Sequence, residues 1–104
     1  MKENSIYDAK SLRTVTGKSA DFSELAKDCV AFSNAQGGML DIGIEDGEKN
    51  PPVGQTIPDA LPTTIVNKIN GMTHGVVLTA ETIKSDHGGE FIRMHIQRNP
   101  NAIA

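Results

Sequence analysis

The sequence predicts an α+β domain in which two helices pack on one face of a mixed β-sheet, with the element order β-α-β-β-α-β-β. Three observations predict it. Apolar residues recur at helical spacing over residues 21–34 and again over 59–71, and they alternate with polar residues over 39–45 and 91–98. A helix cannot bury an apolar stripe alone, so both helices are expected to cover one side of a single sheet.

The composition fits one compact domain over residues 1–104. The chain has no Trp, one Tyr and three Phe, so the core must be built from aliphatic side chains. The formal net charge of −3 argues against a strongly basic nucleic-acid-binding protein, because Lys and Arg normally supply the affinity for phosphate. A local basic patch remains compatible with that charge.

The first helix, its turn and the strand that follows organise the chain. Asp21 and Glu24 form a capping-box-like start, and Gly37 and Gly38 allow the chain to reverse after the helix. Asn34 is expected to cap this turn by hydrogen bonding to nearby backbone. The apolar stripe of the helix consists of Phe22, Leu25, Ala26, Cys29, Val30 and Ser33.

The other elements are predicted in order from their local patterns. Residues 1–10 are expected to form a frayed arm or a short surface helix, and residues 11–18 a first strand. Asp46-Gly47 predicts a hairpin turn, and residues 53–57 a third strand at an edge. Asp59 is the expected N-cap of the second helix, with Pro62 in its first turn. Residues 76–84 and 91–98 predict the last two strands.

The run Ala31-Phe32-Ser33-Asn34-Ala35-Gln36-Gly37-Gly38-Met39-Leu40-Asp41-Ile42-Gly43-Ile44, followed by Glu45-Asp46-Gly47 and by Val53-Gly54, resembles the Schlafen AlbA-like domain. The similarity spans roughly residues 11–100. It implies a DNA-binding module of bacterial transcriptional regulators, some of them divergent AAA-type ATPases. The related domain usually continues with further strand material, so we expect residues 1–104 to be an N-terminal fragment. The structural motif is expected at Asn34, Gly37, Gly38, Gly43, Asp46, Gly47 and Gly54.

Three basic residues are the candidates for nucleic-acid contacts. Arg13 on the predicted first strand and Arg93 on the last could share the sheet face opposite the helices, and Lys18 matches a lysine of the resembled family. Such side chains would contact phosphates and position the protein without reading sequence. The alternative is an ordinary solvated face.

Acidic residues raise the possibility of a divalent metal site at Asp41, Glu45 and Asp46. Some vertebrate Schlafen relatives of the resembled domain cleave RNA with two glutamates on the first strand and an aspartate near the D-G turn. Asp46 matches that aspartate. The glutamate that precedes the family's lysine is unmatched, because this sequence has Thr16-Gly17-Lys18, and the other glutamate, which falls near Ser11 or Leu12, is also absent. We therefore expect no enzymatic activity. The alternative to a metal site is that these acids are solvent-exposed side chains that flank a turn.

Other chemistry is not supported by the motifs. Gly37 and Gly38 follow a helix, whereas a phosphate loop precedes one, and G-x-x-x-x-G-K-[ST] is absent. The three histidines lack metal-ligand spacing, so no metal or cofactor is expected. The lone Cys29 on an apolar stripe predicts a core residue, which suits a cytoplasmic protein. The sequence contains no apolar run of membrane-spanning length.

The sequence is therefore compatible with three functions. The first is a DNA- or RNA-binding module. The second is a protein-interaction or homodimerisation module that offers a partner the free edge of its sheet. The third is a degenerate metal-dependent nuclease.

Overall fold

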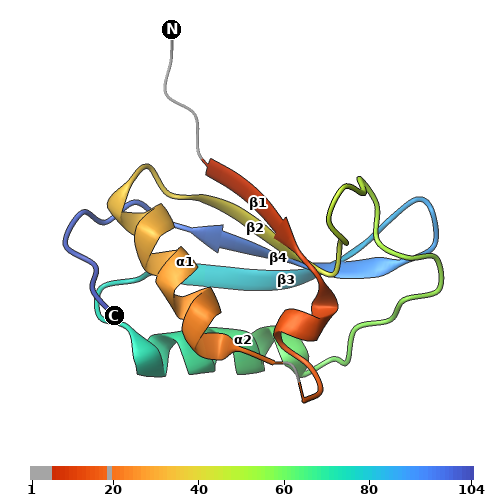
Figure 1. Cartoon of the computed structure of the whole chain (residues 1–104), viewed down its shortest axis with the longest axis horizontal. Coiled ribbons are helices and arrows are strands. Elements are labelled where there is room, and N and C mark those ends of the chain that lie inside the picture. The colour runs from red at the N-terminus through yellow and green to blue at the C-terminus, as the bar shows by residue number, and fades with distance from the viewer. Residues whose placement is uncertain (1–5, 19) are drawn as a thin grey trace, which may run out of the picture.

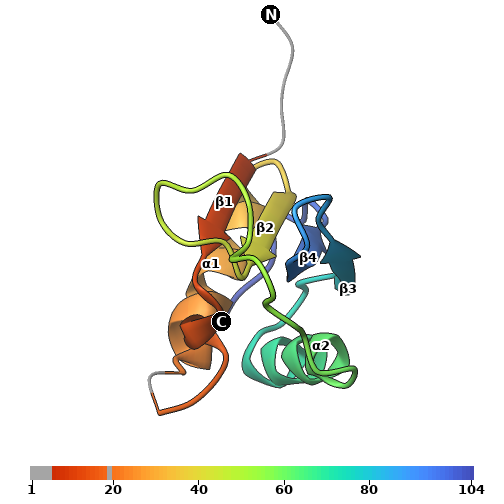
Figure 2. The same ribbon diagram turned by 90° about the vertical axis from the view of Figure 1, so that its right-hand side faces the viewer.

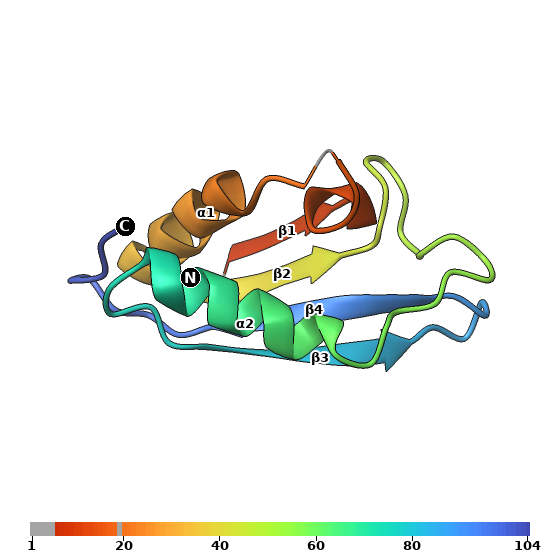
Figure 3. The ribbon, with the colours of Figure 1, turned by 90° about the horizontal axis from the view of Figure 1, so that it is seen from below.

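The computed structural model describes residues 6–18 and 20–104. A four-stranded mixed sheet carries two helices on one face, which confirms the predicted fold class (Figures 1 and 3). The strands are β1 (Ile6–Lys10), β2 (Gly38–Ile42), β3 (Leu78–Lys84) and β4 (Glu90–Ile96). The helices are α1 (Phe22–Asn34) and α2 (Leu61–Met72), and a short 3-10 helix, η1 (Leu12–Thr14), follows β1.

The sheet has the strand order β1-β2-β4-β3. β1 runs parallel to β2, with Ile6 beside Gly38 and Lys10 beside Ile42. β4 lies antiparallel to both β2 and β3. A parallel pair needs a crossover, and α1 supplies it between β1 and β2. β1 and β3 are therefore the two edges of the sheet.

The first strand lies earlier in the chain than the sequence predicts. Residues 6–10 form β1, whereas the predicted strand over residues 11–18 becomes η1 and a turn. The Ser11 hydroxyl accepts a hydrogen bond from the backbone N–H of Arg13 at 3.2 Å, and the Ser11 carbonyl accepts from Thr14 N at 3.0 Å. These local bonds offer the backbone an alternative to a ladder. The expectation of an arm or helix over residues 1–10 is wrong for 6–10, and residues 1–5 lie outside the described residues.

The helix α1 begins and ends where its sequence predicts. The Asp21 carboxylate accepts a hydrogen bond from Glu24 N at 3.1 Å, which caps the first turn. Leu25, Ala26 and Cys29 on its stripe are buried. At its end Ser33, rather than Asn34, makes the side-chain contacts: the Ser33 hydroxyl donates to Gln97 O at 3.0 Å, and Asn34 is exposed.

The paired glycines allow α1 to turn tightly into β2. Gly37 adopts φ +73°, and a Cβ atom there would lie 2.6 Å from the Ile96 carbonyl oxygen. A Cβ atom on Gly38 would overlap the Ile6 carbonyl oxygen of β1. Glycine is therefore required here for two reasons, a left-handed backbone and the close approach of the neighbouring strands.

The segment between β2 and α2 forms a loop, so the predicted third strand over residues 53–57 is wrong. Gln55 fastens this loop to the sheet: its side-chain amide donates to Gly43 O at 2.9 Å and to Glu90 O at 2.8 Å. The Asp46-Gly47 turn exists but does not join two paired strands. Gly54 lies at a second turn of the same loop. Side-chain bonds to Gln55 replace the ladder that a third strand would have made.

The second helix starts one residue later than predicted. Ala60, not Asp59, is its N-cap and makes no side-chain capping bond, while Pro62 occupies the first turn as expected. Ile65 and Ile69 of α2 are fully buried against the sheet. Neither α-helix in the described part of the chain has the length and apolar character needed to cross a membrane.

The core lies between the helices and the sheet. Its fully buried large side chains are aliphatic or Met: Leu25, Leu40, Ile42, Ile65, Ile69, Ile92 and Met94. The opposite side of the sheet, which we call the open face, bears the side chains of the alternate strand positions: Tyr7, Ala9, Met39, Asp41, Thr79, Glu81, Ile83, Phe91, Arg93 and His95.

Candidate nucleic-acid interface

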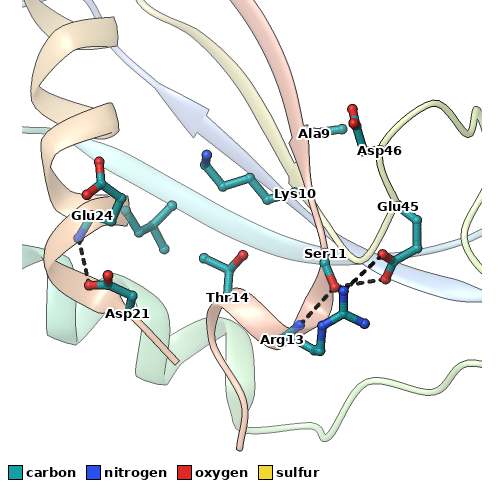
Figure 4. A pocket seen from close by; sticks show the side chains of 10 residues that line it. Ala9, Lys10, Ser11, Arg13, Thr14, Asp21, Glu24, Glu45 and Asp46 are labelled. Carbon is teal, nitrogen blue, oxygen red and sulfur yellow. Dashed lines mark hydrogen bonds and ion pairs between the residues drawn. The ribbon is translucent and has the colours of Figure 1, made fainter. Parts of the chain in front are cut away.

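An open cavity of about 440 Å³ lies where the end of β1, η1 and the start of α1 meet the loop after β2 (Figure 4). Side chains of both charges line it. The lining residues are Ala9, Lys10, Ser11, Arg13, Thr14, Asp21, Glu24, Leu25, Glu45 and Asp46. Three of the candidate residues from the sequence, Arg13, Glu45 and Asp46, therefore come together at this cavity.

Arg13 projects from η1 at the rim of the cavity. Its side chain is 72% exposed, and its guanidinium lies 3.5 Å from the Glu45 carboxylate. The other oxygen of Glu45 accepts a hydrogen bond from the Ser11 hydroxyl at 2.8 Å (Figure 4). Val15, which caps the end of η1, is buried in the core. Glu45 thus holds Arg13 in place, but the exposed pair contributes little to stability.

Lys10 lines the cavity, but its ammonium already forms ion pairs with carboxylates of the protein. Its ammonium lies 2.9 Å from the Asp28 carboxylate of α1 and 3.5 Å from that of Asp8. The hydrogen bond with Asp28 raises the pKa of Lys10 above its ordinary value. This pair links β1 to α1, so we assign Lys10 a structural role.

Lys18 is exposed on the loop between η1 and α1. Within residues 6–18 and 20–104, no carboxylate lies within ion-pair distance of it. Lys18 and Arg13 lie on the same short segment, five positions apart. Arg13 lines the cavity, whereas Lys18 is not among its lining residues; we call these two exposed cations the basic rim.

Acidic side chains outnumber basic ones inside the cavity by two. The four carboxylates belong to Asp21, Glu24, Glu45 and Asp46. The hydrogen bond from Glu24 N lowers the pKa of Asp21 below its ordinary value. Like charges repel, so a phosphate would be excluded from the cavity floor and would be favoured only at the rim.

The proposed trio of metal ligands is separated by the fold. Asp41 lies on the open face, whereas Glu45 and Asp46 lie beside the cavity. Among the described residues, no three side chains of His, Cys, Asp or Glu are placed to share a metal ion. The Ser11 hydroxyl donates to Glu45 at 2.8 Å and the Thr16 hydroxyl donates to the Leu12 carbonyl at 2.9 Å.

Arg93 lies on the open face and does not join Arg13 and Lys18. Its Nε and Nη2 atoms donate to the two oxygens of Asp41 at 2.9 and 3.0 Å. The Tyr7 hydroxyl donates to the same carboxylate at 2.7 Å. Asp41 is fully buried under these partners, and the Arg93 side chain keeps 30% of its exposure. The hydrogen bond with Asp41 raises the pKa of Arg93 above its ordinary value.

The remaining titratable candidates do not converge on a site. His95 lies 3.1 Å from Glu81 across the open face, and His74 and His87 are exposed elsewhere. Burial raises the pKa of Cys29 to about 12, so the thiol stays protonated in the core. This agrees with the core role that the helix stripe predicts.

Sequence reasoning missed the contributions of Tyr7 and Gln55. Tyr7 fell in a segment expected to be an arm, and only the parallel pairing of β1 with β2 brings it near Asp41. Gln55 fell in an expected strand. No local signal marks either residue, because both contacts join segments far apart in the chain.

Comparison with known proteins identifies the family. No curated protein sequence matches the chain. A family model described as Schlafen, AlbA_2 matches residues 3–103, which is nearly the whole sequence. This match, on a mixed sheet covered on one face by two helices, shows that the chain belongs to the Schlafen, AlbA_2 family.

Proposed function

We propose that this chain is a nucleic-acid-binding domain that contacts the phosphates of DNA through the basic rim, Arg13 and Lys18, and does not cleave its ligand. Membership of the Schlafen, AlbA_2 family carries the proposal. The geometry supports the location, because both cations are exposed and lie on one short segment. Phosphate contacts of this kind position a protein without reading sequence.

The acids beside the rim restrict how the ligand lies. A phosphate chain is attracted to Arg13 and Lys18 and repelled by the cavity carboxylates. We infer that it tracks along η1 and the loop after it, outside the cavity. Glu45 competes with the ligand for Arg13, since its carboxylate lies 3.5 Å from the guanidinium. Affinity is therefore modest at physiological salt.

Absence of cleavage is proposed from the side chains that line the cavity. A metal-dependent nuclease needs several carboxylates around its ions. Here Ser11 lines the cavity and donates a hydrogen bond to Glu45, and the glutamates that the resemblance expects near Ser11 or Leu12 and before Lys18 are absent. Incubation of the domain with labelled RNA or DNA and Mn²⁺ or Mg²⁺ tests this, and we expect intact substrate.

Fluorescence anisotropy with labelled duplex DNA, single-stranded DNA and RNA at low salt tests binding. We expect Arg13→Ala with Lys18→Ala to abolish most of the signal, and Lys49→Ala with Lys84→Ala, which removes equal charge elsewhere, to retain it. Glu45→Gln should strengthen binding, because it frees Arg13 and removes a negative charge while keeping an acceptor for Ser11. Failure of the wild-type domain to retain any nucleic acid at low salt would overturn the proposal.

The same proposal places the domain in a bacterial transcriptional regulator. Its own net charge of −3 gives it little general affinity for DNA. A second DNA-binding element in the same protein, such as a winged helix, would supply the missing specificity. Sequencing of the genomic region downstream of residue 104 tests this part.

A second candidate is a protein-interaction module without affinity for nucleic acid. The acidic net charge favours it, and so does β3, which forms an edge of the sheet. Light scattering and anisotropy on the same sample distinguish the two functions, because an oligomer that ignores nucleic acid supports only the second.

A further inference from the structure

The strand β3 offers an edge for a further strand. Gln97 N donates to Val77 O at 2.9 Å and Ser85 N to Gly89 O at 2.8 Å, so the odd-numbered residues of this segment face β4. The even-numbered residues, Leu78 to Lys84, therefore direct their backbone N–H and C=O groups away from the sheet. Pairing with β4 is uninterrupted over all seven residues of β3, and none is proline.

The helices leave this edge accessible. α2 packs beneath β3 and β4 rather than beyond the edge of the sheet (Figures 2 and 3). A regular strand edge of this length is a template for pairing with another chain unless charges or bulges block it. Within β3 only Glu81 and Lys84 carry charge.

The side chains along the open face of this edge form a self-complementary row. Val77 is 51% exposed at one end, and partly buried Ile83 lies at the other. The exposed polar residues Thr79 and Glu81 lie between them. Read in reverse, the row again has apolar ends and a polar centre, which is the property that a two-fold symmetric pairing needs.

We propose that β3 pairs antiparallel with β3 of a second copy of this chain about a two-fold axis at Ala80. The small Ala80 side chains then meet at the centre, and the outward backbone groups of Leu78 pair with those of Thr82 of the partner subunit. On the open face, Val77 lies opposite Ile83 of the partner subunit. Thr79 lies opposite Glu81 of the partner subunit, so the hydroxyl can donate to the carboxylate.

The neighbouring registers are less favourable. An axis at Glu81 places this residue directly opposite Glu81 of the partner subunit, and like charges in that position are destabilising. An axis at Thr82 places Glu81 against the apolar Ile83 of the partner subunit and shortens the pairing. Only the axis at Ala80 matches apolar with apolar and donor with acceptor.

The dimer joins two sheets into one of eight strands. The strand order β1-β2-β4-β3 keeps β1 and its cavity at the far edge of each copy. Both basic rims stay exposed, at opposite ends of the assembly. This last consequence rests on the proposed function, whereas the pairing itself does not.

Light scattering on the full chain, without nucleic acid, over a wide range of concentrations tests the pairing. We expect twice the mass of one chain at high concentration. Thr79→Glu places a carboxylate opposite Glu81 of the partner subunit at two symmetry-related positions, and should weaken the dimer about tenfold. Thr79→Lys places an ammonium at the same two positions, and should strengthen the dimer by a similar factor. The same substitutions at Thr56, exposed on the loop before α2, should leave the dissociation constant unchanged.

A backbone variant provides a second test. The Ala80 N–H points away from β4, so Ala80→Pro removes a donor from the edge without removing a ladder bond. We expect a monomer whose circular dichroism matches that of the wild type. A wild-type chain that stays monomeric at every concentration, or a dimer that responds equally to Thr79→Glu and Thr79→Lys, would refute the interface. Nucleic-acid binding is measured separately, so its failure would leave this result standing.

Discussion

Arg93 binds Asp41 through two hydrogen bonds, from Nε at 2.9 Å and from Nη2 at 3.0 Å, across the pair of strands β4 and β2. The two residues are direct partners in the antiparallel register. This pairing holds the buried Asp41 carboxylate on the open face. It also means that Arg93, the candidate for phosphate contacts on the last strand, is bound to a partner within the protein.

Removing either partner of this pair should destabilise the fold. Asp41→Ala leaves Arg93 without its acceptor but in contact with water, and we expect a loss of about 3 kcal/mol in the free energy of unfolding. Arg93→Ala leaves a fully buried carboxylate with Tyr7 as its remaining partner, so about 4 kcal/mol is expected. Urea titration measures both. The double variant Asp41→Leu with Arg93→Met is the control and should recover most of the loss. A cost below about 1 kcal/mol for each single variant would contradict this account.

Tyr7 should titrate far above the range of an ordinary phenol. Burial, followed by the hydrogen bond to Asp41, raises the pKa of Tyr7 to about 12. The chain has one Tyr and no Trp, so tyrosinate absorbance reports this residue alone. We expect a midpoint near 12 in the folded protein and near the ordinary value of about 10 in urea. A folded midpoint at the urea value would show that the contact with Asp41 does not persist in solution.

The same pKa predicts how stability depends on pH. The folded state favours the protonated phenol, so its contribution is fully present below about pH 10 and is lost as the pH rises through the folded pKa of about 12. Tyr7→Phe cannot ionise and serves as the control. Urea titrations between these pH values should show a steeper loss of stability for the wild type than for Tyr7→Phe.

Two glycine-to-alanine substitutions should have opposite effects. Gly38→Ala places a Cβ atom against the Ile6 carbonyl oxygen, so β1 must separate from β2, and we expect a loss of at least about 2 kcal/mol. Gly71 lies in α2 with open space where a methyl group would lie, so Gly71→Ala should stabilise the protein by about 0.5–1 kcal/mol. Thermal and urea unfolding measure both. Equal effects of the two variants would argue against the tight contact between β1 and β2.

The basic rim predicts a specific salt dependence. Each phosphate contact releases counterions and adds about 0.9 to the slope of log affinity against log salt for duplex DNA. Replacing both Arg13 and Lys18 with Ala should therefore reduce the slope by about 2. Arg93→Ala should leave the slope unchanged, since its guanidinium is held by Asp41. A slope that changes with Arg93 and not with Arg13 would move the interface to the open face.

The elements that the sequence predicted correctly are those whose signals are local. Asp21 caps α1, the stripe through Leu25 and Cys29 is buried, and Gly37 ends the helix as its position indicates. The strand that the sequence did not predict, β1, depends on distant partners. β1 contains polar Asp8 and Lys10 and shows little strand pattern, yet it pairs with β2 along its whole length and its lysine contacts Asp28 of α1.

The positions of the three candidate cations follow the same distinction between local and distant contacts. Arg13 and Lys18 are close in sequence and lie on one segment of the fold, whereas Arg93 belongs to a strand whose alternation directs it to the opposite face from the helices. The alternation over residues 39–45 gives Asp41 and Glu45 the same parity, but β2 ends at Ile42. Once the strand ends, the alternation of side chains no longer determines where Glu45 points.

The sequence by itself determined the fold class, the first helix with its glycine turn and the aliphatic core, because periodicity, capping and backbone freedom act over a few residues. Only the tertiary structure decided which charges are paired. Parallel pairing of β1 with β2 brings Tyr7 to Asp41, and the antiparallel pairing of β4 brings Arg93 to the same carboxylate. Those contacts join residues 34 and 52 positions apart, and no local pattern can specify a partner at such distances.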